Sequence, residues 1–208
     1  HEAVKEVNDI IMFKKVNYIL DCDIKGFFDN VNHEWLMKFL ENDIADKNFL
    51  RYIVRFLKAG VMVENRQEHT EVGTPQGGLI SPVLANVYLH YVLDWWFEEL
   101  IKSYMKGEAY LVRYADDFII GVIGNKKEAQ EIKENIIEWM SKNLKLEVSE
   151  EKTKLTHNSE KIRFLGYDII SVRNSQKKFD NCNIKLSVPY DVMVNFIIKN
   201  HFGKWWNN

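Results

Sequence analysis

Three aspartates stand beside apolar segments, where an unpaired charge is costly. Asp23 follows the apolar run Tyr18-Ile19-Leu20, and Asp116 and Asp117 lie inside the apolar and aromatic segment 110–123. A buried carboxylate without a partner costs several kcal/mol. Acids at the same end of two such segments are therefore explained if they bind a shared cation. Oxygen-only ligands favour a hard ion, Mg²⁺ or Mn²⁺. Transfer of a phosphoryl group from a nucleotide commonly uses two such ions, about 3.5–4 Å apart.

A simpler interpretation exists for Asp116 and Asp117. Asp favours turns, so Ala115-Asp116-Asp117 could be only the turn of a hairpin between two apolar strands. Asp23 is a further aspartate beside an apolar run, on a separate segment, and this repetition favours the metal-binding interpretation.

The elements that would hold these acids alternate between short strands and long helices. Strands are predicted at 17–23, 110–114, 117–123, 153–156 and 162–171, with hairpins at 61–72 and toward 188. Helices are predicted at 2–13, 32–41, 46–59, 81–104 and 126–144, and from Pro189 onward. Asn32 is a predicted N-cap, and Ser81 is predicted to cap a helix whose first residue is Pro82. This order predicts an α+β fold in which an antiparallel sheet is backed by helices.

The charge balance allows two interpretations. The 208 residues carry a formal net charge of −2, whereas a protein that tracks phosphates unaided is usually basic. The chain is therefore either not a nucleic-acid binder or a fragment that carries the acidic, metal-binding part of a larger basic protein. The start at His1 and the end just after Trp205-Trp206 favour a fragment.

Other features place the chain in a reducing, cytoplasmic setting. Cys22 and Cys182 form neither a disulfide framework nor a CxxC metal pattern. The uncharged run 77–93 is short for a membrane span and is interpreted as a buried loop and helix, so no membrane association is expected.

Five blocks resemble, in order, the motifs of reverse transcriptases. They are DIKGFFDN (23–30), TPQGGLISPVLAN (74–86), YADD (114–117), KTK (152–154) and FLGY (164–167). The versions found here are most similar to those of group II intron-encoded proteins (maturases) of bacteria, with retron-like and other bacterial reverse transcriptases as near relatives.

The resemblance implies a right-hand polymerase architecture and an activity. Residues 1–188 would form the palm with partial fingers, and 189–208 would begin the connection to the thumb. The activity would be RNA-directed DNA synthesis with two Mg²⁺ ions, for which Mn²⁺ could substitute. The partners would be an RNA template, a DNA primer, deoxynucleotides and group II intron RNA, with a homodimer compatible with the exposed edges of a fragment. The parent protein would also assist splicing and mobility.

The resemblance also assigns roles to single residues. The catalytic, metal-binding acids would be Asp23, Asp116 and Asp117, with the backbone carbonyl of Ile24 as a further metal ligand. Phe28 would be the steric gate against a ribose 2′-hydroxyl, or Phe27 if the register shifts by one. The contacts to nucleotide and template would come from Gln76, Gly77, Ser81, Pro82, Tyr114 and Ala115. The primer grip would be formed by Phe164, Leu165, Gly166 and Tyr167.

Several alternatives stay open at this point. Lys152 would be either a general acid for pyrophosphate or a solvated lysine, and Gln76-Gly77-Gly78 could be a plain turn. The basic segment 152–178 is either a solvated face or a phosphate contact. A non-enzymatic RNA-binding splicing scaffold would be favoured by loss of one of the three aspartates, and all three are present. An RNA-dependent RNA polymerase is disfavoured by the bulky Phe28 and by Ala115.

Overall fold

The centre of the molecule is a four-stranded antiparallel sheet. The computed structural model describes residues 2–58, 61–63, 66–68, 73, 79–105, 107–149, 152–173 and 182–199. The strands of the sheet are β1 (Tyr18–Cys22), β4 (Ala109–Tyr114), β5 (Asp117–Val122) and β6 (Lys154–His157). Their order is β4-β5-β1-β6, so β1 lies between β5 and β6. The predicted antiparallel sheet is confirmed, and the apolar β1 is in its interior because it is paired on both sides.

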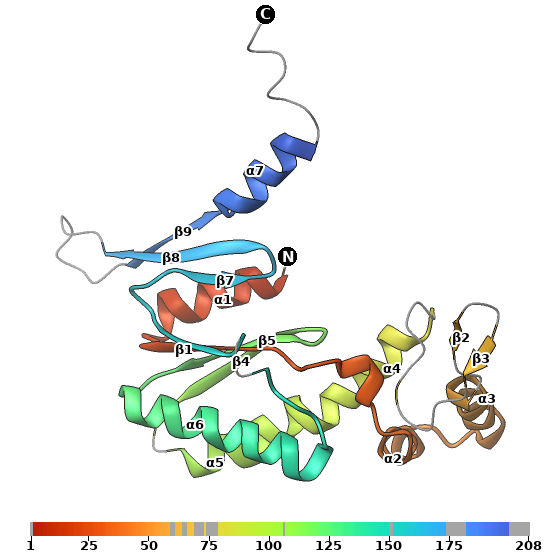
Figure 1. The fold of residues 1–208 in the computed structure, drawn as a ribbon. Coiled ribbons are helices and arrows are strands. Elements are labelled where there is room, and N and C mark those ends of the chain that lie inside the picture. The colour runs from red at the N-terminus through yellow and green to blue at the C-terminus, as the bar shows by residue number, and fades with distance from the viewer. Residues whose placement is uncertain are drawn as a thin grey trace, which may run out of the picture.

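Two long helices cover one face of this sheet (Figure 1). The first runs from α4 (Ser81–Leu89) through two stretches of wider π-type turns (His90–Trp95 and Phe97–Ile101) to α5 (Lys102–Tyr104). The second is α6 (Lys126–Trp139), which continues in π-type turns through Met140–Leu144. This second helix confirms the helix predicted at 126–144, and its buried side chains are Ala129, Ile132, Ile136, Met140 and Leu144.

A tryptophan pair illustrates how the first long helix meets the core. Trp96 is buried and stacks on Trp139 of α6, with ring centroids 4.1 Å apart. The neighbouring Trp95 is 54% exposed. One ring is buried and its neighbour exposed because consecutive helical residues point about 100° apart.

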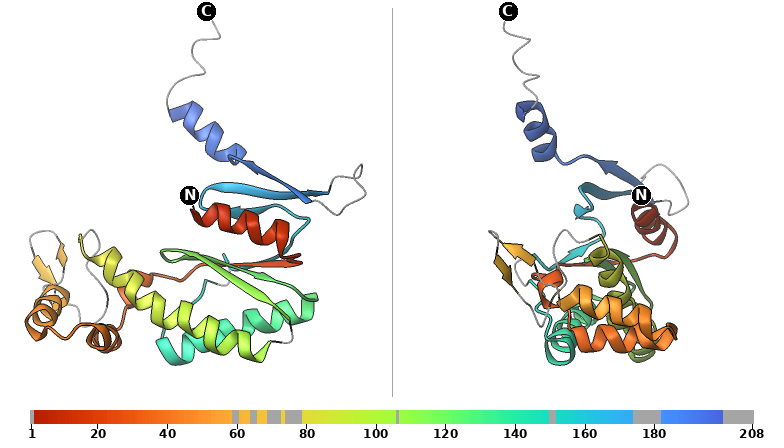
Figure 2. Two further views of the ribbon diagram at one scale, coloured as in Figure 1. Left: turned by 180° about the vertical axis from the view of Figure 1, so that it is seen from behind. Right: turned by 90° about the vertical axis from the view of Figure 1, so that its right-hand side faces the viewer.

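The other face of the sheet is covered by α1 (Glu2–Phe13) and then by a second sheet. This three-stranded sheet contains β7 (Ile162–Phe164), β8 (Tyr167–Arg173) and β9 (Cys182–Ser187), in that order. Apolar side chains of α1 pack between Ile19 and Ile119 of the first sheet and Ile162 and Ile169 of the second. Figure 2 shows α1 held between the two sheets from both directions, and α7 (Tyr190–Lys199) leading away from β9.

The segment between β1 and the first long helix forms an extension at one end of the molecule. It contains a short 3₁₀ turn (Phe27–Asn30), α2 (His33–Asp43), α3 (Lys47–Lys58), and the short hairpin of β2 (Val61–Val63) and β3 (Arg66–Glu68). Asn32 caps α2 as predicted, because its side chain accepts a hydrogen bond from the backbone N–H of Trp35.

The start of the first long helix differs from the prediction by one residue. Ile80 is the N-cap, Ser81 is the first helical residue and Pro82 the second. Ser81 is buried. Proline is tolerated here because backbone N–H groups in the first turn have no partner within the helix. Within the described residues no helix is long and apolar enough to cross a bilayer.

Candidate active site

The sheet brings the three predicted acids to one end and one face. Asp23 directly follows β1, and Asp117 begins β5. The register pairs Cys22 with Phe118, so one further step sets Asp23 opposite Asp117. Side chains alternate along a strand, and Ile119 packs toward α1. Asp117, two residues before Ile119, therefore belongs to the α1-facing side of the sheet.

The third acid is carried by a tight turn. Tyr114 pairs with Asp117, which leaves Ala115 and Asp116 as a two-residue loop between β4 and β5. Ala115 has φ +56°, a left-handed conformation that normally favours glycine at this position of a hairpin. Such strain persists only where the surrounding structure enforces it, and it is common at functional sites.

The electrostatics of this end of the sheet favour a bound cation. Burial, followed by the negative charges of Asp116 and Asp23, raises the pKa of Asp117 above its ordinary value, although Lys152 acts in the opposite direction. A fourth acid, Asp21, lies two residues before Asp23 in the chain. Burial, Asp117 and Asp23 raise the pKa of Asp21 to about 6. Each carboxylate thus makes it harder to ionise its neighbours, and a divalent cation would relieve this repulsion.

Lys152 is the positive charge already present among these acids. Its Nζ lies 3.1 Å from Oδ2 of Asp23 and donates a hydrogen bond to it. The lysine precedes β6, the neighbour of β1 on the other side from β5. The sheet thus places Lys152 beside the acids, although its side chain is 69% exposed, and both of its predicted roles stay open.

A cavity of about 390 Å³ opens in front of Asp23 and Asp116. Its wall includes Phe28, Lys152 and the backbone of the 24–28 segment. Phe27 also reaches this cavity, but its ring is 2% exposed and packs against Tyr88 in the core. Phe28 is only partly buried and meets Phe27 edge-on, with ring centroids 5.5 Å apart. Phe28 is therefore the ring better placed to contact a ligand in the cavity.

The backbone around Ile24 leaves its carbonyl out of the local sheet pairing. Ile24 forms an isolated bridge with Val148. The two hydrogen bonds of that bridge run from Lys25 N–H to Glu147 and from Ser149 N–H to the carbonyl of Asp23. The Ile24 carbonyl takes no part in these two hydrogen bonds, and its use as a metal ligand stays a prediction.

The acids have the oxygen donors that a hard divalent ion prefers, but their side chains are too far apart to bind one ion together. All the donors are oxygens, which suits Mg²⁺ or Mn²⁺. Among the described residues, no three His, Cys, Asp or Glu side chains converge closely enough to hold one ion as they stand. Asp117 is exposed and Asp116 is half-exposed.

The predicted nucleotide-binding block is only partly described. Gln76 and Gly77 lie outside the described residues. Of the residues predicted to support the template, Ser81 is buried and Pro82 is exposed, so only Pro82 offers its side chain to a strand. Tyr114 is 50% exposed at the rim of the hairpin.

Gly73, which the sequence analysis did not single out, anchors the start of that block. Its N–H donates to the carbonyl of Val31 at 2.9 Å, and His33 hydrogen-bonds to its carbonyl. Its φ is +93°, and an added Cβ would lie 2.9 Å from the backbone of Asp29. Only glycine fits there, and its place just before the TPQGG residues was the available signal.

The predicted primer grip is a tight hairpin between β7 and β8. Phe164 is buried beneath it, while Leu165 (φ +48°) and Gly166 (φ +77°) form the two-residue turn before Tyr167. The basic residues nearby are neutralised within the protein. Lys161 and Arg163 pair with Asp168, and Arg163 also reaches Asp191 of α7 at 2.6 Å. A solvated or internally paired face therefore describes these two better than a phosphate contact.

Arg113 is a second residue that the sequence analysis left without a role. Its guanidinium makes a two-pronged contact with Asp94 of the long helix, at 2.7 and 2.5 Å. The same group donates to Asn86 at 2.9 Å and to the carbonyl of Ala115 at 3.0 Å. Arg113 thus ties the strained turn before Asp116 to the helix behind it. Its position immediately before YADD was the signal.

Known proteins are similar to this chain in sequence. The family model described as "Reverse transcriptase (RNA-dependent DNA polymerase)" matches residues 3–169. The group II intron-encoded protein LtrA of Lactococcus lactis subsp. cremoris is 34% identical, and the match covers 91% of this chain and 42% of LtrA. The COX1/OXI3 intron 1 protein of Saccharomyces cerevisiae is 31% identical over 80% of this chain and 25% of its own length. The chain thus spans less than half of either relative.

A solved structure shows the same fold. Apo telomerase from Candida tropicalis, truncated from its C-terminal domain, aligns with a TM-score of 0.60 at 19% identity, covering 89% of this chain and 39% of its own. The predicted α+β polymerase palm is confirmed by this likeness and by the antiparallel sheet with its helical backing. Because the family model covers most of the chain and the relatives are intron-encoded, the chain belongs to the reverse transcriptase (RNA-dependent DNA polymerase) family, as a domain of the group II intron-encoded type.

Proposed function

We propose that this chain carries the polymerase centre of an RNA-directed DNA polymerase that extends a DNA primer on an RNA template with deoxynucleotides. The observation that carries the proposal is the convergence of Asp23 and Asp117 on adjacent strands, with Asp116 on the turn between β4 and β5. A nucleotidyl-transfer site with divalent ions requires acids that lie close together and make each other harder to ionise.

Each residue has a task in this proposal. Asp23, Asp116, Asp117 and the Ile24 carbonyl hold two Mg²⁺ ions, with Mn²⁺ as a substitute. The ions, when bound, supply charge neutralisation and a more acidic primer hydroxyl. Phe28 lines the cavity in front of Asp23 and excludes a 2′-hydroxyl by its bulk. Lys152 is near enough to the acids to give a proton to the leaving pyrophosphate.

The wider partners follow from the intron-encoded relatives. Group II intron RNA is proposed as a partner of the parent protein, which would also assist splicing and mobility. Residues 1–188 are proposed as palm with partial fingers, and 189–208 as the beginning of the connection to the thumb.

Primer extension tests the activity. A chain extended at both ends to the length of the LtrA-like relatives is given an RNA template, a labelled DNA primer, deoxynucleotides and Mg²⁺. Extension is expected, and Asp116→Asn should reduce it by at least about a thousandfold. Glu131→Gln, an exposed carboxylate on α6, is the matched control and should leave the rate unchanged. Extension by Asp116→Asn at the normal rate would reject the assignment of the catalytic acids, and no extension by the unaltered protein would reject the activity in favour of a non-enzymatic scaffold.

A further inference from the structure

The outer face of α3 carries a row of cations that no part of the proposed polymerase site uses. Lys47, Arg51 and Arg55 are spaced four residues apart, so they lie on one side of the helix, and all three are exposed. The opposite side holds Leu50, Ile53 and Leu57, which are buried in the core. The row, called the α3 cation row below, is about 12 Å long at 1.5 Å per residue.

The α3 cation row is not neutralised by the protein. Within the described part of the chain, none of its three members forms an ion pair with a carboxylate. Arg51 donates only to the side-chain amide oxygen of Asn48, at 3.1 Å. Glu41 of α2 borders the groove that Lys47 and Arg51 share, without pairing with either. The α3 helix itself contains no Asp or Glu.

Some other exposed cations of the molecule are paired with carboxylates. On α6 and its continuation, Lys127 pairs with Glu131 and Lys142 with Glu138, one turn apart. Lys161 and Arg163 are held by Asp168 and Asp191. Among the described residues, three exposed cations without a carboxylate partner within nine residues concentrate positive charge on one helix face, which suits a negatively charged partner from outside the chain.

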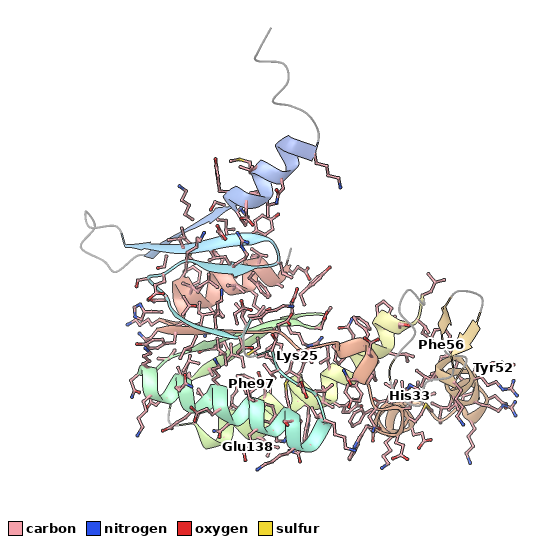
Figure 3. The ribbon with its side chains drawn as sticks, in the orientation of Figure 1. Lys25, His33, Tyr52, Phe56, Phe97 and Glu138 are labelled. Carbon is pink, nitrogen blue, oxygen red and sulfur yellow. The ribbon has the colours of Figure 1, made fainter. Side chains whose placement is uncertain are left out.

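Aromatic rings stand beside the α3 cation row. Tyr52 is 62% exposed and Phe49 47%. The Arg55 guanidinium lies over the Tyr52 ring, 5.9 Å from its centroid. Figure 3 shows Tyr52 at the outer edge of the extension, away from the sheet that carries the acids. Cations track phosphates and an exposed ring stacks on a base, so the combination matches a nucleic-acid strand.

We propose that the outer face of α3 binds single-stranded RNA through Lys47, Arg51 and Arg55, with Tyr52 stacking on a base. This surface is separate from the cavity in front of Asp23 and would hold RNA outside the catalytic cleft. The choice of RNA over DNA rests on the proposed function; the choice of a nucleic acid rests on the cations and rings alone. An apolar protein partner would leave the three cations without counter-charges.

Direct binding of labelled RNA tests the proposal in the absence of metal and nucleotides. The probe is an unstructured single-stranded RNA, and fluorescence anisotropy is measured with the full chain in EDTA at about 50 and 200 mM salt. The variant replaces Lys47, Arg51 and Arg55 by Gln. The matched control replaces Lys126, Lys127 and Lys142 of the α6 region by Gln, which removes the same charge from another exposed helix. Circular dichroism verifies that both variants are folded.

The α3 variant should bind RNA at least about tenfold more weakly at the lower salt, and its logarithmic salt slope should fall by about 2. The control should keep the slope of the parent. Tyr52→Leu should weaken binding several-fold and Tyr52→Phe should not, because stacking needs the ring and not its hydroxyl. Equal losses in the two triple variants, or none in either, would overturn the proposal.

Two further experiments distinguish a failure of the RNA-binding proposal from a failure of the polymerase proposal. A DNA strand of the same sequence that binds equally well and depends equally on the α3 cation row would overturn the preference for RNA. Primer extension by the longer protein reports on the polymerase proposal independently, since the binding assay contains neither Mg²⁺ nor deoxynucleotides.

Discussion

The Lys152 ammonium lies 3.1 Å from a carboxylate oxygen of Asp23, although 129 residues separate them in the chain. The pair forms because β6 and β5 flank β1, which ends at the residue before Asp23. In the absence of a metal ion, this lysine is the counter-charge of a carboxylate that the proposed function assigns to the metal. A bound ion and Lys152 therefore compete for the same oxygen.

Removal of that competitor should tighten metal binding. Lys152→Met is expected to bind Mn²⁺ several-fold more tightly without substrate, since an exposed ion pair is worth up to about 1 kcal/mol. Electron paramagnetic resonance of free Mn²⁺ measures the affinity. Lys126→Met, on α6, serves as the control. If Lys152→Met binds Mn²⁺ no better than the control, the ion pair does not compete with metal. A slower extension rate in the same variant would agree with proton donation by Lys152.

The Arg113–Asp94 contact should couple the long helix to the catalytic turn. Arg113→Met and Asp94→Asn should each slow single-turnover extension by about ten- to a hundredfold, because the turn loses the donor to the Ala115 carbonyl. Each should also lower the free energy of unfolding, as one partner of a largely buried pair is left alone. The double variant should lose much less than the sum of the two effects. Strict additivity of the rate effects would show that the contact does not position the turn.

The two phenylalanines should respond differently to truncation. Phe28→Ala opens the wall of the cavity and should raise ribonucleotide incorporation relative to deoxynucleotide, with a modest loss of stability. Phe27→Ala should cost about 3–5 kcal/mol in the free energy of unfolding, because this ring is buried against Tyr88. Urea denaturation and the ratio of kcat/KM values for the two sugars measure these effects. A change in sugar selectivity confined to Phe27→Ala would assign the gate to the other ring.

Asp21 should make the stability of the metal-free chain depend on pH. Its pKa is about 6 in the folded protein, above its ordinary value of 3.8. A raised carboxyl pKa stabilises the folded state only while the group is protonated, so the contribution is complete below pH 3.8 and is lost as the pH rises to about 6. Asp21→Asn should therefore be more stable than the parent at pH 7, by about 1–2 kcal/mol after allowance for partial exposure.

That difference should shrink toward zero at about pH 3, below the pKa of Asp21 in both states. Thermal denaturation in EDTA at the two pH values provides the measurement. Glu6→Gln, on the exposed side of α1, is the control for loss of one negative charge. A stability gain for Asp21→Asn that is equal at both pH values would mean that burial and the neighbouring acids do not raise this pKa.

Asp116→Asn should leave the metal-free fold intact. The charge of Asp116 contributes to the raised pKa of Asp117, so its removal relieves repulsion. The thermal midpoint in EDTA should stay level or rise, while the stabilisation gained on adding Mn²⁺ should shrink. A midpoint that falls by several degrees would instead indicate a structural role for the Asp116 carboxylate in the turn.

Local sequence was sufficient for most of the elements. The apolar runs around the acids predicted β1, β4 and β5, and a 3.6-residue apolar period predicted α6 through Leu144. Asn32 and Pro189 marked helix starts that the structure has at His33 and Tyr190. Such features depend on side chains a few residues apart, so the sequence contains them directly. The order of five motifs then identified the family and the acids.

The geometry of the site needed the tertiary structure. Strand order and register decide that Asp23 faces Asp117, that Asp21 joins them, and that Lys152 reaches Asp23, and these pairings join residues about a hundred positions apart. The link from Arg113 to Asp94 and Ala115 depends on how the long helix packs against β4. That no member of the α3 cation row pairs with a carboxylate of the described residues likewise depends on how the neighbouring elements pack. Contacts between distant segments depend on how the whole core packs, and no local pattern encodes them.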